Sequence, residues 1–174
     1  HDVTLFEKND RIGGLLRYGI PDYRLPQAVL QKEIDWLLAH GVEVRTGMAL
    51  GKDITLDELR RDFDGVILAM GCWKSSPMRV PGEDLNGVLG GINFLYDVKT
   101  NPDVKIGRRV AVVGGGNTAM DACRSARRLG AEEVSVLYRR SREEMPADDL
   151  EIEEATGEGV NFIYLAAPKS IEGN

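Results

Sequence analysis

The sequence predicts an α/β fold in which short strands alternate with helices in two consecutive blocks. Short apolar, β-branched runs alternate with amphipathic segments of helical period, which is typical of parallel βαβ units. Glycine is frequent, with 20 among 174 residues, against a usual ~7%, and glycine marks tight turns and close approach to ligands. A polar stretch containing Pro77, Pro81 and Gly82 separates the blocks and predicts a connection between domains or sub-domains.

The first block predicts a βαβ unit that is followed by a short helix and a buried strand. Apolar residues recur at three- and four-residue intervals from Gln27 to His40, with Pro26 at the start and Gly41 as the stop. Thr55 and Glu58 have the spacing of a capping box. The continuous apolar run between Gly65 and Gly71 is typical of a central parallel strand. The expected elements are a strand at 3–6, a helix at 27–40, a strand at 42–44, a helix beginning at 55 and a strand at 65–71.

The second block restarts the alternation of strand and helix. A loop at 101–107 precedes the strand at 109–113, and Gly130 ends the helix at 117–129. The expected elements are a helix at 91–98, a strand at 109–113, a helix at 117–129, a strand at 134–138, a helix at 148–156 and a strand at 160–165.

Composition excludes several classes of function. A formal charge of −6 argues against a nucleic-acid surface, which needs clustered lysine and arginine. Two widely separated cysteines exclude a C-x-x-C redox pair and an all-cysteine metal or iron–sulfur site, and two histidines leave few metal ligands. No apolar run is long enough to span a membrane, and we expect a cytoplasmic protein. The chain begins without methionine and inside a predicted strand, which suggests a piece of a longer protein.

The most specific motif is the glycine-rich run that follows the strand at 109–113. Gly114, Gly116 and Ala119 match G-x-G-x-x-A, a variant of the dinucleotide-binding fingerprint, between a predicted strand and a predicted helix. The first glycine permits the tight turn, and the second lets backbone N–H groups reach a pyrophosphate at the helix N-terminus. The alanine permits close packing of helix on strand. The alternative is a glycine-rich turn without a ligand.

The residues after the next strand indicate which dinucleotide is bound. Folds that select NAD usually carry Asp or Glu there, about 20 residues after the glycines, to hold the ribose 2′-hydroxyl. This sequence has Arg139 and Arg140 instead, and guanidinium groups can pair with a 2′-phosphate. The sequence therefore favours NADPH over NADH, and the alternative is that both arginines are solvated loop residues beside Arg142.

A weaker motif lies at the N-terminus. The run from Val3 to Glu7 is an apolar strand that ends in an acid, as in the second strand of an FAD-binding Rossmann unit, where the carboxylate accepts hydrogen bonds from ribose hydroxyls. The glycine-rich loop that should precede such an acid is not in this chain. From these residues alone, an exposed acid at a strand end is the better explanation of Glu7.

Taken together, the two blocks resemble the glutamate synthase small-subunit family. The family includes the related flavin parts of ferredoxin-dependent NADP oxidoreductases and dihydropyrimidine dehydrogenase. The resemblance covers essentially the whole chain and rests on an ordered set of motifs: Glu7-Lys8, Ile12-Gly13-Gly14-Leu15, Tyr18-Gly19-Ile20-Pro21, Arg24-Leu25-Pro26, Gly114 to Asp121, Tyr138-Arg139-Arg140 and Glu144-Met145-Pro146.

The resemblance implies an α/β protein in which a Rossmann-like parallel-sheet NADPH domain is joined to part of an FAD-binding Rossmann-like domain. It implies a partial FAD-binding domain at 1–82, without its N-terminal phosphate loop, and an NADPH-binding domain at 83–174. The implied FAD-binding residues are Glu7, Gly14, Leu15, Arg24, Leu50 and Gly71. The implied NADP(H)-binding residues are Gly114, Gly115, Gly116, Asn117, Thr118, Ala119, Arg139 and Arg140. For the FAD set, core packing of the leucines, a surface ion pair of Arg24 and a strand-end turn at Gly71 stay open as alternatives.

The resemblance further implies a flavoprotein oxidoreductase of glutamate biosynthesis that passes hydride from NADPH to FAD. Electrons would continue to iron–sulfur centres, which would lie only in missing segments or partners, such as a glutamate synthase large subunit. No side chain of this chain is assigned as acid, base or nucleophile, because the cofactors carry such chemistry. The alternative is an NADP(H)-binding module without redox turnover, and a third reading is an α/β domain whose glycines serve packing alone.

Two further features are expected to be structural. His40 lies at the end of a predicted helix, where it meets the helix dipole favourably. Glu151, Glu153, Glu154 and Glu158 form an acidic block that we expect to be a solvated helix face, with guidance of a basic partner as the alternative.

Overall fold

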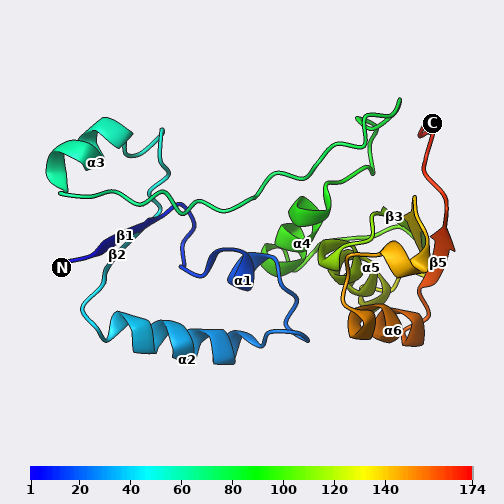
Figure 1. The fold of residues 1–174 in the computed structure, drawn as a ribbon, viewed down its shortest axis with the longest axis horizontal. Helices are drawn as coiled ribbons and strands as arrows, with labels where there is room; N and C mark the ends of the chain where they lie inside the picture. Colours follow the sequence, from blue (N-terminus) through cyan, green and yellow to red (C-terminus); the bar gives the residue numbers. More distant parts are fainter. Residues whose placement is uncertain (174) are drawn as a thin grey trace. The chain divides into compact units, whose positions relative to one another are not determined.

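The computed structural model describes residues 1–173 and divides into two compact units, unit 1 (His1–Cys72) and unit 2 (Trp73–Asn174). Each unit contains its own parallel sheet (Figure 1). The polar connection at 73–85 belongs to unit 2, where the Ile171 N–H donates to Pro81 O at 2.8 Å. The α/β class with parallel sheets that the sequence predicts is confirmed. The functional domain limits 1–82 and 83–174 stay predictions.

Unit 1 is a βαβ arrangement with two further short helices. Its strands are parallel, with Leu5 opposite Val44. The elements are β1 (Thr4–Glu7), α1 (Gly14–Tyr18), α2 (Gln27–Leu38), β2 (Glu43–Thr46) and α3 (Leu56–Asp62). The predicted capping box is present at the start of α3, where Thr55 Oγ1 accepts from the Glu58 N–H at 3.2 Å and Glu58 Oε2 accepts from the Thr55 N–H at 2.8 Å. Four expected elements of this block are therefore confirmed.

The predicted strand at 65–71 is wrong. This segment is irregular, and Ile67 is 91% exposed. A strand needs a neighbouring strand to pair its N–H and C=O groups. Within residues 1–173, the sheet of unit 1 consists of β1 and β2 alone. The apolar run therefore has the composition of a buried strand without a strand that pairs with it.

Unit 2 is a three-stranded parallel sheet with order β3-β4-β5 and helices packed against it. Its elements are α4 (Gly91–Thr100), β3 (Arg109–Val113), α5 (Asn117–Arg128), β4 (Glu133–Tyr138), the 3-10 helix η1 (Arg142–Glu144), α6 (Asp149–Gly157) and β5 (Asn161–Tyr164). All six elements expected in this block are found with ends shifted by a few residues at most.

Helix α5 is the centre of unit 2. It contacts α4, α6, β3 and β4, and all of its residues from 119 to 126 are buried. The innermost side chains are Met120 and Cys123 of α5 with Val134 and Val136 of β4. Because the helix is covered on several sides, its N-terminus is held rigidly at the end of β3.

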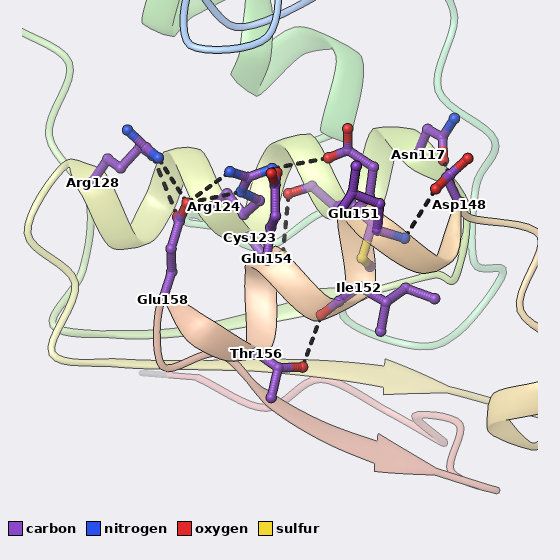
Figure 2. Close-up of polar contacts among 12 residues, drawn as sticks. Asn117, Cys123, Arg124, Arg128, Asp148, Glu151, Ile152, Glu154, Thr156 and Glu158 are labelled. Atoms are coloured by element: carbon purple, nitrogen blue, oxygen red, sulfur yellow. Dashed lines mark hydrogen bonds and ion pairs between the residues drawn. The ribbon is translucent and has the colours of Figure 1, made fainter.

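The acidic block is a solvated helix face only in part. Glu153 is exposed, as expected. Glu151 and Glu154 of α6 and Glu158 at its C-terminal end instead all pair with Arg124 of α5 (Figure 2). For these three residues the expectation was wrong because the spacing that places acids on one helix face does not reveal that this face meets a buried arginine.

Candidate functional site: the glycine turn of unit 2

The glycine turn joins β3 to α5 and is built by backbone geometry. Gly114 has φ +144, a conformation that side chains disfavour, and its N–H extends the sheet by donating to Leu137 O at 3.0 Å. Gly116 is the N-cap of α5, and no side chain caps this helix end. The first N–H groups of α5 and the positive end of its dipole are therefore available to an anion.

Ala119 packs closely against the turn, as its small size predicts. It is 9% exposed, and a Cβ atom added to Gly114 would lie 3.5 Å from the Ala119 Cβ. Thr118 and Asn117 are exposed at the first turn of the helix. The turn therefore has its small residues inside and its polar residues outside.

Gly115 is required for a packing reason that the sequence did not reveal. A Cβ atom at Gly115 would lie 2.5 Å from two ring carbons of Tyr138, at the end of β4. The Tyr138 hydroxyl donates to Glu144 O at 2.7 Å, which fixes the ring. No local sequence pattern signals this contact, because Gly115 and Tyr138 are distant in sequence.

The segment from Tyr138 to Asp148 folds back onto the glycine turn. The Ala147 N–H donates to Gly115 O at 3.0 Å. The Asp148 N–H donates to Asn117 Oδ1 at 3.2 Å, a contact visible in Figure 2. The glycine turn is thus held in place by the segment between β4 and α6, which contains Arg139 and Arg140.

Arg139 and Arg140 directly follow β4 and are exposed. Since β3 and β4 are parallel, the glycine turn and the arginines lie at the same edge of the sheet. Throughout residues 1–173, no hydrogen bond or ion pair engages either guanidinium group. Arg142 differs, because it pairs with Asp149 at 2.8 Å. Two cationic groups without a protein partner form a donor set that suits a phosphate.

The predicted residues of unit 1 lie on several different elements and loops. Glu7 ends β1, and its Oε1 accepts from the Asn9 N–H at 2.8 Å and from Asn9 Nδ2 at 2.9 Å, so Oε2 faces no protein donor among the described residues. The Met48 N–H donates to Glu7 O at 2.9 Å, which brings the segment leading to Leu50 beside the end of β1. Gly71 has φ +67 and is exposed in the irregular segment at 65–71.

Gly14 and Leu15 begin α1, and Arg24 lies in the turn before α2. Gly14 has φ +53, Leu15 is half-buried, and the half-buried Arg24 donates its N–H to Pro21 O at 3.0 Å. The sequence reasoning missed Arg17 of α1, which is 4% exposed. Its guanidinium donates to Ile12 O at 2.6 Å and to Gln31 Oε1 at 2.7 Å, and so holds the loop before Gly14 in place.

The remaining nucleophilic and metal-binding side chains do not form a second site. Burial raises the pKa of the Cys123 thiol to about 12, and its Sγ lies 3.2 Å from Met120 O. His40 lies beyond the end of α2, with Nδ1 2.9 Å from Trp36 O, in a structural role. Within residues 1–173, no group of His, Cys, Asp or Glu side chains could hold a metal ion, and none of the helices is long and apolar enough to cross a membrane.

Known proteins share both the sequence and the fold of this chain. The beta subunit of an NADP(+)-dependent formate dehydrogenase from Moorella thermoacetica is 46% identical over 98% of this chain and 25% of its own length. The beta subunit of an NADPH-Fe(3+) oxidoreductase from Geobacter sulfurreducens is 48% identical over 91% of this chain and 24% of its own length. The small chain of glutamate synthase [NADPH] from Azospirillum brasilense is 36% identical over the whole chain and 39% of its own length. The chain therefore spans about a quarter to two-fifths of these relatives.

Solved structures have the same fold at low sequence identity. FprA from Mycobacterium tuberculosis, in a complex with NADPH, has a TM-score of 0.86 and 19% identity over 99% of this chain and 54% of its own. The resemblance to the glutamate synthase small-subunit family is confirmed by relatives of that name. The family model for pyridine nucleotide-disulphide oxidoreductases matches residues 3–174. The chain belongs to the pyridine nucleotide-disulphide oxidoreductase family.

Proposed function

We propose that unit 2 binds NADPH, with the pyrophosphate at the glycine turn and the 2′-phosphate between Arg139 and Arg140. The observation that carries this proposal is a pair of guanidinium groups, unpartnered among the described residues, at the same sheet edge as a helix N-terminus without a side-chain cap. The chain as a whole is acidic, with a formal charge of −6. A free pair of cations is therefore a local feature that favours an anionic ligand.

The residues of the glycine turn have different proposed roles in binding NADPH. Gly114, Gly115 and Gly116 shape the backbone, Asn117 and Thr118 begin the helix that faces the phosphates, and Ala119 sets the distance between helix and strand. NADPH binding is also named for a structural neighbour, FprA, and three relatives carry NADP or NADPH in their names.

We propose in addition that unit 1 supplies part of an FAD site. Glu7 Oε2, which faces no protein donor, suits the hydroxyls of a ribose. Gly14 and Leu15 offer a helix start, and Arg24 offers a cation in the following turn. Leu50 and Gly71 are proposed to line the adenine and flavin, and the rest of the site would come from other parts of the full protein.

In the full protein, NADPH and FAD would supply the chemistry of hydride transfer when bound, and iron–sulfur centres outside this chain would accept the electrons. The side chains of this chain bind and orient the two cofactors and supply no acid or base. A glutamate synthase large subunit is the electron acceptor that we propose from the sequence resemblance. The names of two other relatives point to other electron-transfer partners, a formate dehydrogenase and ferric iron. The free thiols of Cys72 and Cys123 favour a reducing, cytoplasmic location.

Replacing both arginines tests the NADPH site. In R139Q/R140Q, we expect NADPH to bind about 10- to 100-fold more weakly, a loss of about 1.4–2.8 kcal/mol, which is the worth of about one charge-assisted hydrogen bond at this exposed site. The affinity for NADH should change less than about twofold, since NADH has no 2′-phosphate. Arg109→Gln is the matched control, because Arg109 is also exposed but pairs with Glu133 at 2.9 Å. Equal losses for NADPH and NADH would overturn the assignment.

A second candidate is an NADP(H)-binding module without redox turnover. The observation in its favour is that strand, glycine turn, helix and arginines all lie within unit 2, whereas the described sheet of unit 1 has two strands. A yellow preparation with a flavin spectrum that NADPH bleaches would support the oxidoreductase. A colourless preparation that binds NADPH would support the binding module.

A further inference from the structure

The contact between α5 and α6 is made by a buried arginine surrounded by carboxylates. The Arg124 side chain is 5% exposed, and its guanidinium lies 2.9 Å from Glu151, 2.6 Å from Glu154 and 2.7 Å from Glu158. Arg128, one helical turn later, also pairs with Glu158 at 2.7 Å. Figure 2 shows the three carboxylates converging on Arg124 from one face of α6.

The same two helices also meet at the glycine turn. The residues that enter α6 bond to the turn through the Ala147 N–H to Gly115 O and the Asp148 N–H to Asn117 Oδ1. Helix α6 is thus fixed to α5 at the first turn of α5 and again two turns later, at Arg124. The segment 139–148, which begins with the two arginines, ends at the first of these points.

We propose that Arg124 is a positioning residue for the NADPH site: by holding α6 against α5 it keeps segment 139–148 docked on the glycine turn. This inference rests on the proposed function of that turn. Arg124 itself does not contact the cofactor. It acts through α6, because its loss would remove the cation that three carboxylates share at a partly buried contact, where like charges repel.

The predicted loss of affinity for NADPH follows from the fraction of molecules in which segment 139–148 is docked on the glycine turn. If α6 shifts and segment 139–148 is docked in only about a tenth of the molecules, the apparent Kd for NADPH rises about tenfold. Lysine at this position keeps the positive charge, but its single ammonium group cannot bond several carboxylates as the forked guanidinium does. The affinity of R124K for NADPH should therefore be about threefold lower than that of wild type.

The test compares R124Q and R124K with wild type and with R108Q in a temperature range where circular dichroism shows each protein folded. Arg108 is the matched control, because it forms a two-pronged ion pair with Glu132, at 2.8 and 2.7 Å, away from α6. We expect NADPH binding about tenfold weaker in R124Q and changed by less than about twofold in R108Q. In the same samples without cofactor, the amides of Ala147 and Asp148 should exchange hydrogen faster in R124Q and not in R108Q.

Folded R124Q with wild-type affinity and wild-type amide protection would overturn the role of Arg124. If R124Q does not fold, the same readouts on R124K decide, and unchanged values there would overturn it equally. Wild-type protein that does not bind NADPH would instead refute the proposed function. The exchange rates separate the two failures, because they report the docking of the segment without any cofactor.

Discussion

Replacing Gly115 by alanine places a methyl group against the ring of Tyr138. The added Cβ would lie 2.5 Å from two ring carbons, whereas carbon atoms pack at about 3.5–4.0 Å. The ring must therefore move by about 1 Å or more. The Tyr138 hydroxyl donates to Glu144 O at 2.7 Å, and a shift of this size breaks that bond.

The expected cost adds two effects. Overpacking of a well-packed site costs about 1–3 kcal/mol. The lost hydrogen bond adds about 0.5–1.5 kcal/mol. Gly115→Ala should therefore lower the free energy of unfolding by about 2–4 kcal/mol. Urea denaturation followed by circular dichroism measures this value directly.

The neighbouring glycine provides the control. Gly116 has φ −96, and the atom nearest to a Cβ added there is Pro146 Cγ at 4.0 Å. Gly116→Ala should therefore cost about 1 kcal/mol or less in stability, from the poorer N-cap. It should still weaken NADPH binding, because the methyl group would lie where, in the proposed site, backbone N–H groups approach the pyrophosphate. Equal stability losses in the two variants would refute the packing role of Tyr138.

Two more predictions follow from shifted pKa values. Burial raises the pKa of Cys123 to about 12. A thiol reagent at neutral pH should therefore modify Cys72, which is exposed, and leave Cys123 unmodified until the protein unfolds. Modification of both thiols in the folded protein would contradict this. Burial alone would raise the pKa of Glu158, but hydrogen bonds from Arg124 and Arg128 outweigh it and hold this pKa below the usual 4.5. This contribution to stability is present above pH 4.5 and is lost as the pH falls through the lowered pKa. In urea denaturation, the free energy of unfolding should therefore fall less on acidification in E158Q than in wild type. An equal fall in both proteins would contradict this.

Local patterns predicted most of the fold. The period of α2, the capping box at Thr55 and the strand–glycine–helix order of unit 2 all act within a few residues, so the sequence contains them in full. The strand at 65–71 could not be judged in this way. Its formation depends on a neighbouring strand, and an apolar run does not show whether that neighbour is present.

The site was predicted in part for the same reason. The fingerprint located the glycine turn, because its residues are contiguous and each has a defined backbone role. Tyr138 over Gly115 and Arg124 between three glutamates are contacts between residues distant in sequence. The spacing of Glu151, Glu154 and Glu158 and that of Arg124 and Arg128 each place like charges on one helix face, but the spacing alone does not show that the two faces meet.

The most direct test of the central claim is the ratio of dissociation constants for NADPH and NADH, measured by titration calorimetry on the wild-type chain. Free Arg139 and Arg140 beside the glycine turn predict that NADPH binds about tenfold or more tightly than NADH, which corresponds to about 1.4 kcal/mol or more from the 2′-phosphate. Equal affinities, or tighter binding of NADH, would contradict the account.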